Sequence, residues 1–214
     1  MKTWIVFFLT NLWLTIAKSQ TIGDLFVQLP QRTFIPLQKM VGVSFTTAMR
    51  KSLITQKTHQ AIRNFRQDNV HAYLTFATET DGDGYSFEMT YWKLPDGNKL
   101  IVSTVNNNGN CSQFTEQVDF WLYKQGQLSN VSNQYRPPLT LSKFYKKSSA
   151  TLSKLQKSGI NYGLWKLPQV GTTIWVEPPQ YDCDTDAMPL GDYYFLLVWQ
   201  GNSFQMLRKE MANR

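Results

Sequence analysis

The pattern of hydrophobic and polar positions changes from a helical to a strand period near residue 70. Before that point, apolar residues recur at the three- and four-residue spacing of a helix, at Ile22, Leu25, Phe26 and Leu29. Thr21 and Asp24 resemble a capping box at the start of this segment, and Pro30 stops the pattern. A second helical stretch, rich in Lys and Arg, is predicted between residues 46 and 66.

From about Val70 the period is two, which is typical of antiparallel strands. The segment "AYLTFATE" alternates, and so does "YSFEMTYWKL", in which Tyr85, Phe87, Met89 and Tyr91 share one face. Short turns with Gly separate these runs and favour a meander. Further hairpins are predicted at residues 118–131, 162–176 and 192–206, and one or two short helices at 139–158 that Gly159 ends. The run "YYFLLVW" is apolar at every position, which predicts a central strand covered on both faces.

Two of the predicted hairpins resemble each other. "WKLP" occurs at residues 92–95 and again at 165–168, and each copy is followed by a turn, an apolar strand and a later aromatic hairpin. The order of these features predicts a duplication, although a match of four residues can also arise by chance. The expected fold is therefore α+β and rich in β-hairpins, with two tandem helix-plus-antiparallel-sheet modules at 20–137 and 138–214.

The N-terminus has the features of a cleaved signal peptide at residues 1–19. Lys2 precedes the apolar run "WIVFFLTNLWLTI", and Ala17 and Ser19 supply small residues before Gln20. A membrane anchor is the alternative, but the run is short for a bilayer span. Removal of Lys2 and Lys18 lowers the formal net charge from +7 to +5, because 7 − 2 = 5. This charge suits an anionic surface or simple solubility, and export argues against a nucleic-acid partner. We expect a secreted or periplasmic protein with no transmembrane span in its mature chain.

Cysteines and acidic clusters supply the first candidates for chemistry. Cys111 and Cys183 lie in equivalent connectors of the two predicted modules, so an oxidising compartment favours a disulfide between them; free thiols or a bond to a partner are the alternatives. Asp81 and Asp83 lie in "ETDGDG", which lacks the ligand spacing of an EF-hand and fits a turn better. The three aspartates of "DCDTD", Asp182, Asp184 and Asp186, suit a hard cation or, more often, a solvated loop.

The sequence contains no recognisable catalytic motif. Its two histidines lack zinc-ligand spacing, and there is no nucleophile elbow, P-loop or dinucleotide-binding motif. We therefore expect no catalytic residue, no metal and no cofactor.

Aromatic and basic residues are the remaining candidates, and they suggest binding. Trp121 and Tyr123 are predicted to be exposed on a strand, where such side chains contact sugars or proteins, although sheet core is the commoner role. Lys143, Lys146 and Lys147 lie in a segment without acidic residues, which fits anionic glycans or lipid headgroups, or else a solvated helix face.

Two resemblances point in the same direction. The segment "TIGDLFVQLP" after a signal, followed by Gly-turn hairpins, resembles uncharacterised secreted proteins of Bacteroidetes-type bacteria. Two tandem helix-plus-sheet modules resemble the architecture of secreted β-lactamase-inhibitor proteins, which implies a fold and not a function. The sequence therefore predicts a non-enzymatic protein that binds a protein or glycan of the cell envelope or extracellular space. The alternative is a secreted or periplasmic hydrolase acting on glycans.

Overall fold

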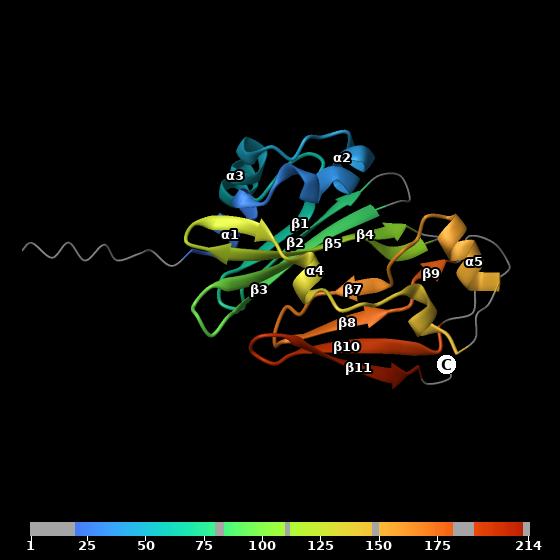
Figure 1. Ribbon diagram of the computed structural model, residues 1–214. Coiled ribbons are helices and arrows are strands. Elements are labelled where there is room, and N and C mark those ends of the chain that lie inside the picture. Colours follow the sequence, from blue (N-terminus) through green and yellow to red (C-terminus); the bar gives the residue numbers. More distant parts are fainter. Residues whose placement is uncertain (1–19, 80–83, 110–111, 147–149, 182–190, 212–214) are drawn as a thin grey trace, which may run out of the picture.

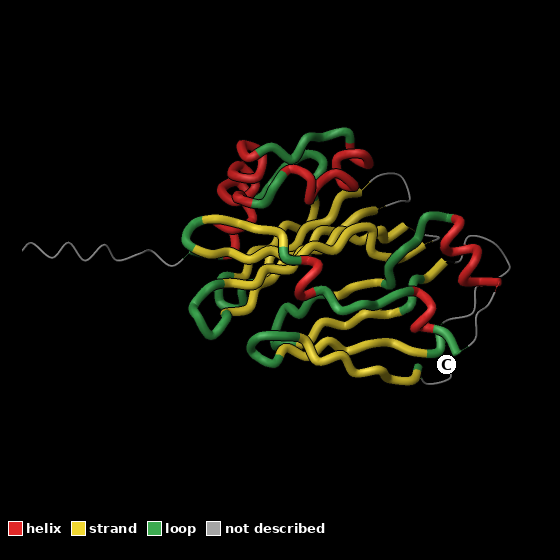
Figure 2. Tube along the Cα trace, in the orientation of Figure 1, coloured by secondary structure: helices red, strands yellow, loops and turns green. Residues whose placement is uncertain are grey.

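Three layers make up the computed structural model: a group of helices, a long antiparallel sheet, and a smaller antiparallel sheet (Figure 1). The structure describes residues 20–79, 84–109, 112–146, 150–181 and 191–211. The tube view shows the same layers, with most of the helix above the first sheet and the second sheet below it (Figure 2). The first sheet is therefore covered on both faces.

The helical layer comes from the start of the described chain. It contains α1 (Ile22–Gln28), η1 (Gln31–Phe34), α2 (Ile35–Val41) and α3 (Thr47–Gln56). The predicted capping box is present, because Thr21 Oγ1 accepts the Asp24 N–H and Asp24 Oδ2 accepts the Thr21 N–H at 2.9 Å. The second predicted helix is shorter than expected, since residues 63–68 form a strand, and α2 was not predicted.

The first sheet is a meander in which neighbours in sequence are neighbours in space. Its strands are β1 (Arg63–Asp68), β2 (Tyr73–Glu79), β3 (Gly84–Lys93), β4 (Lys99–Gly109), β5 (Ser112–Lys124) and β6 (Gln127–Asn130). The short strand β9 (Gln180–Tyr181) adds to β5. As the alternation predicts, Tyr85, Phe87 and Met89 of β3 are buried against the helices.

The second sheet continues the chain in the order β11-β10-β8-β7. Its strands are β7 (Leu164–Lys166), β8 (Thr173–Glu177), β10 (Tyr193–Trp199) and β11 (Phe204–Glu210), after the short helices α4 (Ser132–Tyr135), η2 (Leu141–Phe144) and α5 (Ala150–Lys157). The run "YYFLLVW" is the central strand β10, as predicted. The expectation that both of its faces are covered is wrong, because Phe195 and Leu197 are buried whereas Tyr194, Leu196 and Val198 stay half-exposed on the outer face.

Two hydrophobic cores hold the layers together. The first packs phenylalanines of the helices against the first sheet; the rings of Phe26 and Phe87 lie 5.6 Å apart, and those of Phe76 and Phe87 lie 5.1 Å apart. The second core lies between the two sheets and contains both tryptophans of the repeated "WKLP", Trp92 and Trp165. Each half of the chain therefore supplies one wall of the second core.

A ring of hydrogen bonds joins β7 to the first sheet. Thr115 Oγ1 donates to Asn106 Oδ1 at 2.6 Å and accepts the Trp165 N–H at 2.8 Å. Asn106 Nδ2 then donates to the Trp165 carbonyl at 3.1 Å, which closes the ring. All three residues are buried, so these bonds satisfy polar groups that would otherwise be costly to bury.

The α+β fold with two antiparallel, hairpin-rich sheets is confirmed. Strands β3-β4-β5-β6 and β7-β8-β10-β11 follow the same meander order, and the division into tandem modules stays a prediction. Among the described residues, no helix has the length and apolar character that a membrane crossing requires.

Candidate binding sites

The aromatic pair predicted on β5 is not an exposed surface. Trp121 is 1% exposed and belongs to the core under the helices, with the Arg32 guanidinium 4.9 Å from the centre of its ring. Tyr123 is half-buried against the same core. The expectation that Trp121 is exposed is wrong, because the helices cover that face of β5 and the second sheet covers the other, where Phe120 lies. Tyr123 keeps part of its exposure, and its role in binding stays a prediction.

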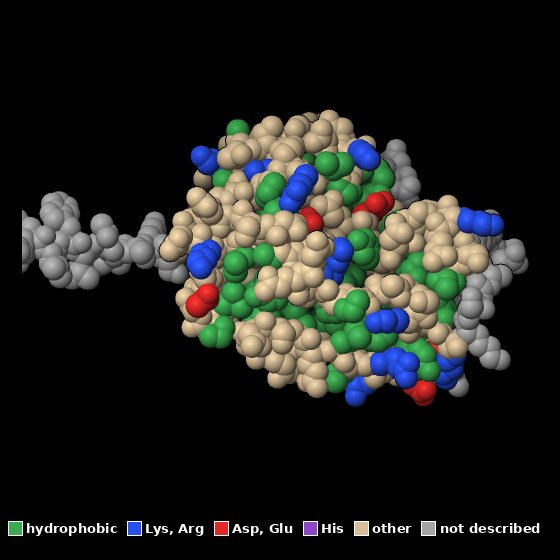
Figure 3. Space-filling model, in the orientation of Figure 1, with side chains coloured by type: hydrophobic (Ala, Val, Ile, Leu, Met, Phe, Trp, Pro, Cys, Tyr) green, Lys and Arg blue, Asp and Glu red, His purple; other side chains and the backbone are tan. Residues whose placement is uncertain are grey.

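The basic segment lies beside a cavity, which we call the η2 cavity. It has a volume of about 370 Å³ and is lined by Ser142, Lys143 and Tyr145 from the η2 segment, Phe195 from β10, and Met206 and Arg208 from β11. Lys143 and Arg208 are the charged members of this lining. Figure 3 shows several Lys and Arg side chains gathered at this end of the second sheet, near the C-terminus.

The charges around the η2 cavity are unevenly balanced. Lys146 lies outside the lining, and its Nζ is 3.5 Å from Glu210 Oε1, so its charge is partly neutralised. The Arg208 guanidinium stacks 4.5 Å from the centre of the Tyr193 ring. Burial, followed by the nearby charge of Asp192, raises the pKa of Tyr145 to about 12, so its hydroxyl remains protonated at neutral pH and can donate. The cavity thus offers cations and a hydroxyl donor above an apolar floor.

The sequence identified one side of this cavity and missed the other. Lys143 belongs to the lining and Lys146 is adjacent to it, whereas Phe195, Met206 and Arg208 were not predicted. Basic residues in "MLRKE" of β11 were the available signal, but nothing local places that strand beside η2. Several residues singled out in the sequence lie outside the described ranges, and the interpretations made of them stay predictions. They are Lys147, the Cys111–Cys183 pair, and the aspartates Asp81, Asp83, Asp182, Asp184 and Asp186.

A carboxyl group lies between the two sheets. Glu88 of β3 accepts the Leu167 N–H at 2.8 Å through Oε2 and has a side-chain hydrogen bond with Tyr73. Burial raises the pKa of Glu88 to about 7, against smaller opposite effects of the Leu167 N–H, Tyr73 and the Lys166 charge. Burial, followed by the Glu88 charge, raises the pKa of Tyr73 above its usual value. Burial between the sheets therefore makes Glu88 a weaker acid than an ordinary glutamate.

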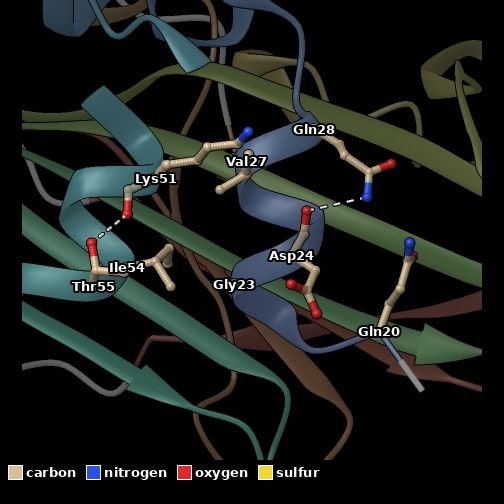
Figure 4. Close-up of a pocket in the computed structure, with 8 residues that line it drawn as sticks. All are labelled: Gln20, Gly23, Asp24, Val27, Gln28, Lys51, Ile54 and Thr55. Carbon is tan, nitrogen blue, oxygen red and sulfur yellow. Dashed lines mark hydrogen bonds between the residues drawn. The ribbon is translucent and has the colours of Figure 1, made fainter. Parts of the chain in front are cut away.

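A second hollow runs between α1 and α3, and we call it the α1–α3 groove. One part, of about 560 Å³, is lined by Gln20, Gly23, Asp24, Val27, Gln28, Lys51, Ile54 and Thr55 (Figure 4). A neighbouring part has a volume of about 760 Å³. It is lined by residues 27–31, at the end of α1 and just after it, by Thr47, Arg50 and Lys51 of α3, and by residues 126–128 of the β5–β6 hairpin. Val27, Gln28 and Lys51 line both parts, so the two hollows adjoin.

Comparison with known proteins yields a fold without a function. No protein-family model and no curated protein matches the chain. A solved structure, that of a domain of an uncharacterised protein from Porphyromonas gingivalis W83, is similar with a TM-score of 0.53 and 12% sequence identity. The match covers 87% of this chain and 97% of that one. Its bacterial source is a member of the Bacteroidetes, and at this identity the likeness shows the fold alone.

Proposed function

We propose that the mature chain is a non-enzymatic binding protein of the cell envelope or extracellular space, and that the η2 cavity receives the anionic end of an amphiphilic ligand. The observation that carries this proposal is the placement of Lys143 and Arg208 around a floor of Phe195 and Met206. An anion would accept hydrogen bonds from the two cations and the Tyr145 hydroxyl. The apolar part of the ligand would cover the floor, as in most small-molecule sites.

The composition of the lining supports an anion over a cation. Lys143 is half-buried, and no ion-pair partner for it is found within the described part of the chain. A cationic ligand would meet two like charges and no carboxylate among the described lining residues. Because part of the site is open to water, we expect affinity to fall as salt is added.

The binding test uses residues 20–214 and two small probes of similar shape. Phenyl phosphate carries an apolar ring and an anion, and benzyl alcohol carries the ring alone. We expect phenyl phosphate to shift the amide resonances of Lys143, Phe195 and Arg208, and benzyl alcohol to bind at least about tenfold more weakly. The double variant Lys143→Gln, Arg208→Gln should lose this preference, whereas Lys157→Gln on the exposed end of α5 should keep it. Equal binding of both probes, or an unchanged preference in the double variant, would refute the site.

The cellular location has its own measurement. The protein is expressed in its source cells, the fractions are separated, and the N-terminus of the mature chain is determined by mass spectrometry. We expect an exported chain that begins at Gln20. A chain that retains residues 1–19 and stays in the cytosol would contradict the envelope location without bearing on the cavity.

One observation favours the alternative, a hydrolase acting on glycans. A carboxyl group with a pKa of about 7, such as Glu88, suits a general acid at neutral pH. Glycoside hydrolysis uses a second carboxyl group. The discriminating measurement is release of reducing sugar from envelope polysaccharides by the wild-type chain and by Glu88→Gln. Hydrolysis that the variant abolishes would replace the binding function with the enzymatic one.

A further inference from the structure

The α1–α3 groove is positively charged near the junction of its two parts, where a buried arginine and an exposed lysine of α3 follow each other. Arg50 of α3 is 3% exposed, yet it lines the larger part of the groove. Its guanidinium donates to the carbonyls of Val27, Leu29 and Phe45. These carbonyls satisfy its hydrogen bonds but carry no full charge. Burial lowers the pKa of Arg50, and no carboxylate among the described residues forms an ion pair with it.

Lys51 extends this positive charge to the surface. It follows Arg50 on α3, is exposed, and lines both parts of the groove. Its ammonium group has no ion-pair partner within the described ranges. Figure 4 shows the Lys51 side chain reaching toward Val27, across the top of the space between α1 and α3. The junction of the two parts is therefore cationic.

The rest of the groove is polar. Amide and hydroxyl side chains from several elements line it, namely Gln20, Gln28, Gln31, Thr47, Thr55 and Gln127. The one carboxylate in the described lining is Asp24, at the opposite end of α1 from the Arg50 site, where it also caps the helix. The charge of Asp24 interacts with the nearby Lys99, whose ammonium group donates to the Gln20 carbonyl, so this end of the groove has little net charge and suits the hydroxyl groups of a ligand.

We propose that the α1–α3 groove binds a saccharide with a single acidic group, which lies beside Lys51 and above Arg50. The neutral sugar units extend toward Asp24 and Thr55. The two adjoining volumes fall within the range of small-ligand sites and together accommodate more than one sugar ring. The site lies on the helical side of the first sheet, whereas the η2 cavity lies on the side of the second sheet, so this proposal does not depend on the one above.

The test compares a trisaccharide that carries one carboxylate with its neutral parent. The probes are 3′-sialyllactose and lactose, titrated into residues 20–214 while amide resonances are recorded at low and at moderate salt. We expect 3′-sialyllactose to shift the amides of Val27, Gln28, Lys51 and Thr55, and lactose to bind at least about tenfold more weakly. Added salt should weaken the acidic probe more than lactose.

Two variants of matched charge decide the role of Lys51. Lys51→Gln should lower the affinity for 3′-sialyllactose about fivefold or more, because it removes the charge at the junction. Lys39→Gln is the control, since Lys39 is an exposed lysine of α2 that does not line the groove. Both replacements are on exposed helix positions, so both variants should fold with the same thermal midpoint as the wild type. Four results would each overturn the proposal. They are lactose binding equal to that of 3′-sialyllactose, resonance shifts confined to other surfaces, no binding of the acidic probe, and equal losses of affinity in both variants.

Discussion

Replacing Glu88 by Gln should stabilise the protein above neutral pH and leave it unchanged in mild acid. The raised pKa of Glu88 means that the folded state holds a proton that the unfolded chain releases. Its stabilising effect is therefore complete below about pH 4.5 and is lost as the pH rises through about 7. The amide of Gln has the shape of the protonated carboxyl and can still accept the Leu167 N–H.

The size of the effect follows from the two pKa values. A tenfold change in proton affinity corresponds to about 1.4 kcal/mol, so the difference between about 7 and the usual 4.5 sets an upper limit of roughly 3 kcal/mol. Glu88 keeps some contact with water, which reduces the cost of its charge, and we expect about 2 kcal/mol. The gain of Glu88→Gln should therefore be about 2 kcal/mol at pH 8 and close to zero at pH 4.5.

The assay is urea unfolding of both proteins at several pH values between 4.5 and 8.5, followed by tryptophan fluorescence. The difference in the free energy of unfolding between variant and wild type removes the contribution of titrating groups that do not interact with Glu88. A difference that is constant with pH would refute the reasoning. So would a variant that is less stable than the wild type at pH 8, because the charged carboxylate would then be the favoured form.

Three further predictions concern the backbone, a buried cation and the cysteines. Gly163→Ala should lower the free energy of unfolding by about 2–4 kcal/mol, because a Cβ there would lie 2.7 Å from Phe144 Cζ and would also collide with the Glu177 carbonyl. The control is Gly42→Ala, which should cost about 1 kcal/mol for its positive φ alone, since nothing lies within 4 Å of a Cβ at that position. Equal losses of the two variants in thermal melts would contradict the close approach at Gly163. Arg50→Met should lower the free energy of unfolding by about 3 kcal/mol, because it leaves the Val27, Leu29 and Phe45 carbonyls without their donor. The neighbouring variant Lys51→Met should change this free energy by less than about 0.5 kcal/mol. Similar losses of both variants in chemical unfolding would argue against the buried role of Arg50. If the chain is exported, we expect a Cys111–Cys183 disulfide, because Ser112 and Tyr181, which lie near the two cysteines in the chain, pair in the β5–β9 ladder. Intact-mass measurement should then show two hydrogens fewer than the reduced chain, and two alkylated thiols without reduction would exclude the bond.

Local patterns determined which parts of this fold could be predicted. Thr21 and Asp24 identify the start of α1 because a capping box involves only neighbouring residues. The alternation in β3 correctly places Tyr85 and Phe87 on one face. By contrast, α2 contains Pro36 and seven residues with a weak period, so its sequence does not distinguish it from a loop.

The misjudged residues depend on contacts between distant segments. Alternation in β5 shows that Trp121 and Phe120 point to opposite faces, but it does not show that both faces are covered. The covering elements lie about 90 residues before and 45 residues after them in the chain, in η1 and β7. The η2 cavity has the same origin: Lys143 was identified as a basic residue, while its neighbours Phe195 and Arg208 are more than 50 positions away.

The shared core between the sheets has a consequence for fragments of this chain. Trp92 and Phe120 come from one half, Trp165 and Phe195 come from the other, and neither sheet has its own cover on this side. A chain divided at the exposed Pro138 would leave each fragment with an open apolar face that fits the other. We expect such fragments to be insoluble or self-associating alone and to reconstitute the native protein when they are co-expressed, which would make this fold a split-protein reporter.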